Sequence, residues 1–268
     1  MQWTAVEWAF LRAVRLTFSK NKLMLAIPAL FMCGAMFLFC NALKMGSWAS
    51  ISLTLLPFFL SFPILAPLGI CLIRLHHHEA KKIPLSWKEL VESSSELILP
   101  TSYLALFPLF TYLLIGLFLG LFFLLLGLPV IGKLFGVLLS FVPFLLLTLS
   151  FLLLLGCLFL LFFFSPLVAL QKVSRKIFVQ KMGELFKERP FSSFSLFLIG
   201  LLPMALIGGI LWLAASWSMG AYVEEGTLLH VLEGFFIMIP FAVFLSIPLI
   251  FFFNFSAECL QLLRIAEE

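Results

Sequence analysis

Long stretches of this sequence contain no charged residue. They include residues 23–43, 45–73, 97–132 and 134–171. A helix needs about 20 predominantly apolar residues to cross the hydrocarbon core of a bilayer, so each stretch is long enough for at least one crossing. Backbone polar groups inside lipid must be satisfied within the chain, which a helix achieves. We therefore predict an all-α, polytopic integral membrane protein.

The composition supports a single membrane domain over residues 1–268. Hydrophobic residues make up 63% of the chain, charged residues 11%, and the mean hydropathy is +1.18. Soluble domains are about half apolar and about one quarter charged, which excludes that class. Apolar runs bounded by charges or turn residues predict six spans in three hairpins. The spans are expected near residues 23–43, 51–73, 99–126, 137–164, 194–216 and 234–255.

The basic residues predict the orientation of these spans. Of the seventeen Lys and Arg residues, all but Lys44 and Lys133 fall in the two terminal segments and the even-numbered loops. Cytoplasmic loops carry an excess of Lys and Arg, so we expect both termini in the cytoplasm of a bacterial cytoplasmic (inner) membrane. The net charge of +4 is therefore explained by the orientation of the protein in the membrane and by contacts with lipid headgroups. Nucleic acid is not expected as a partner.

The span count in the middle of the chain depends on the charges that flank it. Residues 97–171 hold one charge, Lys133, and are flanked on both sides by basic segments. The number of crossings must therefore be even, and we predict two. The excess length must tilt, bend or lie at the interface, and Pro100, Pro108, Pro129 and Pro143 are candidate breaks.

Amphipathic segments precede the first, third and fifth spans. They lie near residues 3–20, 86–98 and 174–189. In the first, Trp3, Val6, Phe10, Val14 and Phe18 share one helical face. We predict helices in the cytoplasmic headgroup layer, each leading into a hairpin. Three degenerate repeats of such a unit could enclose a central site, whereas ordinary basic loops explain the same pattern.

The opening FLRAVRLTFSKNKLMLAIPAL combines a basic amphipathic helix with Asn-Lys and a span that contains proline. It resembles uncharacterised bacterial six-span membrane families with interfacial helices, including the membrane domain attached to some glycerophosphodiester phosphodiesterases. It is also similar to the start of the sulfate-permease family related to cysteine synthesis. The resemblance covers about the first 75 residues and the layout of the rest, and it implies no catalytic residue here.

Candidate chemistry is sparse. The tract His76, His77, His78 and Glu79 is the only metal-like cluster, but adjacent histidines on a helix diverge by about 100°. We predict a solvated or headgroup-facing tract, with a pH-sensitive patch as the alternative. No metal site, cofactor site or catalytic residue is predicted. The five cysteines lie in or beside apolar segments, which favours packing roles.

Buried ionisable residues would mark a proton or ion path, and the six predicted spans contain none. Near the last span, we expect Glu233 and Glu258 at the interface and an interhelical hydrogen bond from Asn254. The motifs Gly116-x-x-x-Gly120 and Gly132-x-x-x-Gly136 allow close helix approach. Packing within one molecule is the first interpretation of both, and homodimerisation is the alternative.

These observations favour a protein without enzymatic activity. The chain contains no Asp, and no Walker loop, G-x-S-x-G or H-E-x-x-H motif occurs. We expect a scaffold or accessory subunit that organises membrane lipids or a membrane protein partner, with a homo-oligomer as a further possibility. The alternative is a permease for a small solute or lipid. A permease requires a polar cavity open to one face, whereas a scaffold requires a packed interior and an exposed apolar surface.

Overall fold

The computed structural model describes residues 3–43, 47–83, 87–128, 141–171, 190–218 and 228–265. Within these ranges the regular secondary structure is entirely helical, as the sequence predicts. The helices are α1 (Trp3–Arg15), α2 (Lys20–Ala42), α3 (Ser47–Ala80), α4 (Trp87–Leu126), α6 (Phe141–Gln171), α8 (Pro190–Ser218) and α9 (Leu228–Ile265).

Every helix in this set except α1 is long and apolar enough to cross a membrane. The six have mean hydropathies of 2.2 to 2.8 over their candidate spans. Two of the candidate spans, 106–126 and 141–170, lie between residues 97 and 171, which matches the predicted pair of crossings. The helices extend beyond most of the predicted spans at one or both ends.

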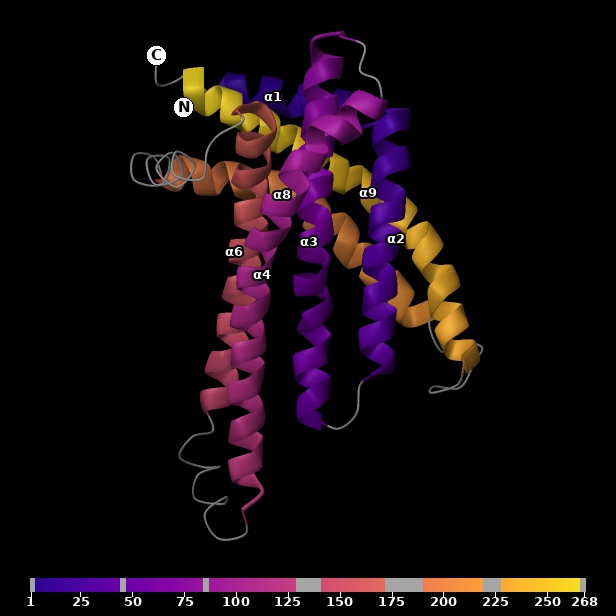
Figure 1. The fold of residues 1–268 in the computed structure, drawn as a ribbon, viewed down its shortest axis with the longest axis vertical. Helices are drawn as coiled ribbons and strands as arrows, with labels where there is room; N and C mark the ends of the chain where they lie inside the picture. The colour runs from indigo at the N-terminus through magenta and orange to yellow at the C-terminus, as the bar shows by residue number, and fades with distance from the viewer. Residues whose placement is uncertain are drawn as a thin grey trace.

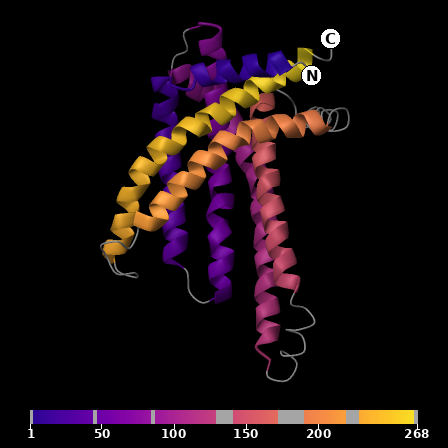
Figure 2. The ribbon, with the colours of Figure 1, turned by 180° about the vertical axis from the view of Figure 1, so that it is seen from behind.

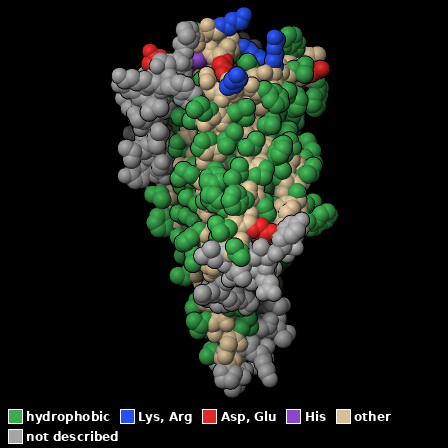
Figure 3. Space-filling model, turned by 90° about the vertical axis from the view of Figure 1, so that its right-hand side faces the viewer, with side chains coloured by type: hydrophobic (Ala, Val, Ile, Leu, Met, Phe, Trp, Pro, Cys, Tyr) green, Lys and Arg blue, Asp and Glu red, His purple; other side chains and the backbone are tan. Residues whose placement is uncertain are grey.

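The six long helices form three hairpins, α2 with α3, α4 with α6, and α8 with α9, and the partners pack against each other in each pair. Figure 1 shows the start of α1 and the end of α9 at the same end of the molecule. Seen from behind, α8 and α9 run obliquely across the other helices (Figure 2). The Lys and Arg side chains visible in Figure 3 gather at the end that holds the termini, beyond a broad apolar zone.

The end of α9 forms the centre of the core. Every residue from Pro248 to Leu260 is buried, because α1, α2, α3, α6 and α8 all contact this helix. Phenylalanine rings fill the space: Phe162 of α6 lies 5.2 Å from Phe252 and 6.2 Å from Phe255, measured between ring centroids. Such ring pairs add about 0.5–1.5 kcal/mol each beyond the burial of their area.

Helix α1 lies across the bundle at the basic end (Figures 1 and 2), packed on α9. Its buried residues are Val6, Ala9 and Ala13. Of the predicted apolar face, Val6 is buried, whereas Trp3 and Val14 are exposed on the outside of the molecule. The two alanines allow α1 to approach α9 closely, and the ring of Phe10 packs against Phe251 and Phe255 of α9, with ring centroids 5.0 and 6.0 Å apart.

The two other predicted interfacial helices have different outcomes. Residues 86–98 do not precede a separate span, because one continuous helix, α4, extends from Trp87 to Leu126 and passes through Pro100 and Pro108. The expected breaks at these two prolines are therefore wrong. The predicted helix at 174–189 lies outside the described residues.

Candidate functional site

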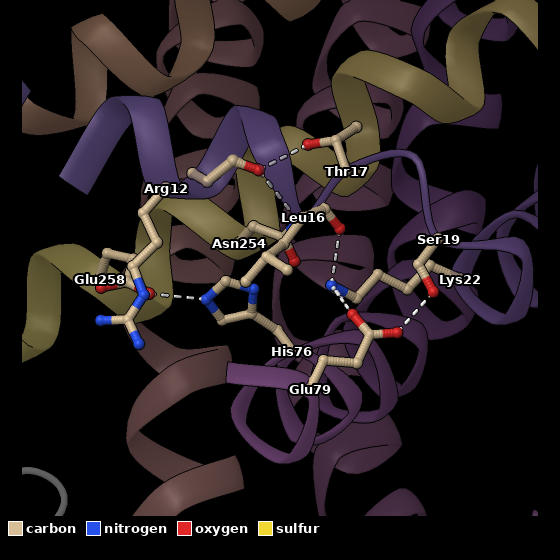
Figure 4. A network of polar contacts seen from close by, with 10 residues as sticks. Arg12, Leu16, Thr17, Ser19, Lys22, His76, Glu79, Asn254 and Glu258 are labelled. Carbon is tan, nitrogen blue, oxygen red and sulfur yellow. Dashed lines mark hydrogen bonds and ion pairs between the residues drawn. The ribbon is translucent and has the colours of Figure 1, made fainter. Parts of the chain in front are cut away.

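Charged and polar side chains meet where α1, α2, α3 and α9 come together at the basic end (Figure 4). We call this group the polar cluster. It contains Arg12, Thr17, Ser19, Lys22, His76, Glu79, Asn254 and Glu258. Burying an ion costs several kcal/mol unless it is paired, so these contacts account for much of how the helix ends are arranged.

Lys22 joins the turn between α1 and α2 to the end of α3. Its side chain is fully buried, and its Nζ atom lies 2.7 Å from Oε2 of Glu79. The same Nζ atom donates a 2.9 Å hydrogen bond to the carbonyl oxygen of Leu16, just beyond the end of α1. Carbonyls at a helix end have no partner within the helix, so the ammonium group satisfies one of them.

Ser19 contributes a second contact to Glu79. It occupies the N-cap position of α2 with an extended backbone, but its hydroxyl makes no capping bond to the helix. It instead donates a hydrogen bond to Oε1 of Glu79. The carboxylate of Glu79 therefore contacts both Ser19, which precedes α2, and Lys22, in the first turn of α2. These two contacts hold the start of α2 against the last turn of α3.

His76 and Glu258 form a buried pair between α3 and α9. The Nε2 atom of His76 lies 2.8 Å from Oε1 of Glu258, and the two side chains are 1% and 7% exposed. An ionised carboxylate can only accept, so Nε2 carries the hydrogen. Arg12 of α1 approaches the same Oε1 atom at 3.5 Å, and its side chain is 46% exposed.

Asn254 lies one helical turn before Glu258, on the same face of α9. Its Nδ2 atom donates a 3.4 Å hydrogen bond to the carbonyl oxygen of Ala13, which also accepts a 2.8 Å bond from Thr17. The predicted interhelical hydrogen bond of Asn254 is thus confirmed. Within the described structure, Nδ1 of His76 and Oδ1 of Asn254 are buried acceptors without a hydrogen-bond partner.

The cluster balances its own charges. Two cations, Lys22 and Arg12, contact two carboxylates, Glu79 and Glu258, and all four groups come from different helices or their ends. Breaking a buried pair on one side typically costs about 3–5 kcal/mol. The polar cluster is therefore a structural junction between helix ends. It includes the buried imidazole of His76, whose Nδ1 atom has no hydrogen-bond partner among the described residues.

One prediction about these residues is wrong. His76 does not belong to a solvated or headgroup-facing tract, because its side chain is buried in the junction. Glu258 lies beyond the predicted end of the last span and is buried next to Arg12 and His76. The spacing of Asn254 and Glu258, four residues apart in a mostly apolar run, is a sequence signal from which their shared face could have been predicted.

Other candidate features of the sequence have structural outcomes too. Among the described residues, no three His, Cys, Asp or Glu side chains are grouped to hold a metal ion. All five cysteines are free, and four are buried. Gly116 lines a very small space between α4 and α6, which agrees with packing within one molecule. Gly132 and Gly136 lie outside the described residues.

Glycines at three other positions permit the close approaches in this part of the fold. A Cβ atom at Gly69 of α3 would lie 2.3 Å from the ring of Phe253, and one at Gly200 of α8 would lie 2.7 Å from the ring of Phe162. At Gly34 of α2, the atom would meet the flexible side chain of Met238 at 2.9 Å. The first two positions cannot accept a side chain without movement of a core ring.

Comparison with known proteins adds no relative. No protein-family model, no curated protein and no solved structure matches this chain. The family resemblances inferred from the opening segment stay predictions.

Proposed function

We propose that this protein is a non-catalytic membrane scaffold or accessory subunit that organises lipid or a membrane protein partner. The observation that carries this proposal is the contrast between a core packed with aromatic rings and long helices with apolar outer faces. A scaffold needs a rigid body and a large surface for its neighbours, and both features are present in the described part of the chain.

The interior supports a packed body. Phe162, Phe252, Phe253 and Phe255 are at most 1% exposed. A pocket of about 210 Å³ lies between α1 and α8, away from these rings, and is lined by residues that include Trp3, Val6 and Phe191. A solute pathway between the hairpins would replace these rings with polar side chains or open space.

The outer faces of α4, α6 and α8 offer the surface. Only 17% of the most apolar window of α6 and of α8 is buried inside the molecule, and 22% of that of α4. Lipid tails are as apolar as leucine, so such faces suit either lipid or a partner helix, and helix association in membranes depends on close packing. Partner binding and lipid organisation are therefore parts of one proposal.

We also propose that the protein lies in a bacterial cytoplasmic membrane with both termini in the cytoplasm. The distribution of Lys and Arg supports this orientation. Exposed tryptophans support the position of the bilayer, since Trp3 and Trp8 lie in α1 at the basic end and Trp212 and Trp217 lie near the other end of α8. Tryptophan is enriched at both membrane interfaces.

Purification in native lipid particles tests the proposed function. The tagged protein is extracted with its surrounding bilayer, and mass spectrometry identifies the proteins and lipids that are recovered in stoichiometric amounts. A defined protein partner or an enriched lipid class supports the proposal. Recovery with bulk lipid alone, together with solute flux in reconstituted vesicles, contradicts it.

A permease is the second candidate, and the polar cluster is the observation that favours it. Ionisable residues inside membrane helices often mark ion or proton paths, and His76 has a free buried nitrogen. Vesicles loaded with a pH-sensitive dye and subjected to a proton gradient test this function. Proton entry that depends on the protein and is lost in the His76→Gln variant would favour the permease; equal rates with and without protein would exclude proton coupling.

A further inference from the structure

The outward face of α1 carries large apolar and basic side chains together. Thr4, Trp8, Leu11 and Arg15 are spaced to lie on one side of the helix, and all four are exposed. We call this set the outer stripe. Trp8 is 75% exposed and Leu11 is 58% exposed, although α1 already buries its opposite side. Trp8 and Leu11 do not contribute to the packing of α1 on the protein, because they lie on the side of the helix that faces away from it.

The rotation of α1 about its axis is fixed by α9. Val6, Ala9 and Ala13 are buried against the bundle, on the side of α1 opposite to the outer stripe. Asn254 holds the carbonyl oxygen of Ala13, and Glu258 faces Arg12. The polar cluster therefore presents the outer stripe in one orientation, at the basic end of the molecule (Figures 1 and 4).

We propose that the outer stripe of α1 is a binding surface for the headgroups of anionic phospholipids. This inference deepens the proposed function, on which it rests, by naming the class of lipid and the residues that contact it. The helix runs across the bundle and not along it, as a helix in the headgroup layer does (Figure 2). Tryptophan and leucine would enter the boundary of the acyl chains, and arginine would meet the phosphate.

Charge decides between anionic lipid and other occupants. Arg12 is partly matched by Glu258. Arg15 and, at the start of α2, Lys20 are exposed, and among the described residues no carboxylate forms an ion pair with either. Glu7 is the one acidic residue of α1 and is also exposed. Each Lys or Arg near an anionic bilayer surface contributes about 1 kcal/mol of attraction. A neutral headgroup would not provide this attraction, so the charge of the region favours an anionic lipid.

Fluorescence of Trp8 in nanodiscs provides the test. The variant keeps Trp8 and replaces Trp3, Trp48, Trp87, Trp212 and Trp217 with phenylalanine. The discs contain a fixed fraction of phosphatidylglycerol or phosphatidylcholine with brominated acyl chains, which quench only nearby indoles. We expect quenching by the brominated phosphatidylglycerol to be about two- to five-fold stronger, because one or two cations enrich it locally.

Two further variants separate the parts of this inference. Arg15→Gln should lower the ratio of the two quenching constants toward one, because it removes the one cation of the outer stripe. A matched control retains only Trp217, which is 82% exposed at the other end of α8, and should show no headgroup preference.

Equal quenching by both lipids in the Trp8 variant would overturn the inference. So would strong quenching of Trp8 by aqueous iodide with weak quenching by either lipid, which would indicate a stripe open to water and suited to a protein partner. Either result would reject the lipid-binding role of α1 without rejecting the proposed function. The proposed function is tested separately, by the recovery of partners and by the flux measurements. A permease could still bind anionic lipid through α1, and a scaffold could lack this preference.

Discussion

Lys22 illustrates what one residue does in this fold. It is fully buried at the start of a membrane-spanning helix, a position at which an unpaired ammonium group would prevent folding. Its contacts with Glu79 and with the carbonyl of Leu16 compensate the positive charge of the ammonium group. They also fix the direction in which the chain passes from α1 into α2. His76 and Glu258 do the same for α3 and α9. Individual polar residues thus determine how the helix ends meet.

We therefore expect Lys22→Met to lower the free energy of unfolding by about 2 kcal/mol, because Glu79, whose side chain is 24% exposed, and the carbonyl of Leu16 both lose their charged partner. The double variant Lys22→Met with Glu79→Leu should recover part of this loss. Steric-trap unfolding in bicelles measures both values. Lys20→Met is the matched control, since Lys20 is exposed and lies in the same turn; its change should stay within about 0.5 kcal/mol. Equal losses for the two lysines would contradict the role of the buried pair.

Among the helices, α3 and α9 have the most neighbours, and their contact depends on a glycine. Each packs against several other helices, including one another. At Gly69 the ring of Phe253 occupies the place that a side chain would take. This close approach keeps His76 within reach of Glu258, so the packing of two helices and the geometry of the polar cluster are linked.

Gly69→Ala should accordingly lower the thermal stability of the purified protein, by about 1–3 kcal/mol in free energy, because a core ring must move. Gly209→Ala provides the comparison. A Cβ atom there meets no atom within 4 Å, and alanine is the better helix former, so stability should stay equal or rise. Loss of stability in both variants would show that helix approach at Gly69 is not the cause.

At the scale of the whole molecule, three hairpins bring both termini to the basic end (Figure 1). The ends of α2, α4 and α8 point away from the basic end, and α4 extends furthest from it. This arrangement follows from an even number of crossings in every hairpin. It also places the polar cluster and α1 on the side of the membrane that we propose to be cytoplasmic.

Reporter fusions test that arrangement in cells. Enzymes that are active only outside the cytoplasm, fused after Lys44, Lys133 and Glu225, should all be active, since these positions fall in the odd-numbered loops. A fusion after Lys82 should be inactive. A cytoplasmic signal at Lys133 would overturn the count of two crossings between residues 97 and 171.

The sequence by itself determined that the chain forms six long apolar helices in three hairpins, because charge-free runs of this length must be helical in lipid. It also indicated the hydrogen bond of Asn254. It could not locate the partners of Lys22, His76 and Glu258, since those contacts join helices far apart in the chain. Only the tertiary structure decided which residues are buried, because burial of an ion depends on a countercharge that another helix supplies. The outward face of α1 is a consequence of the same contacts.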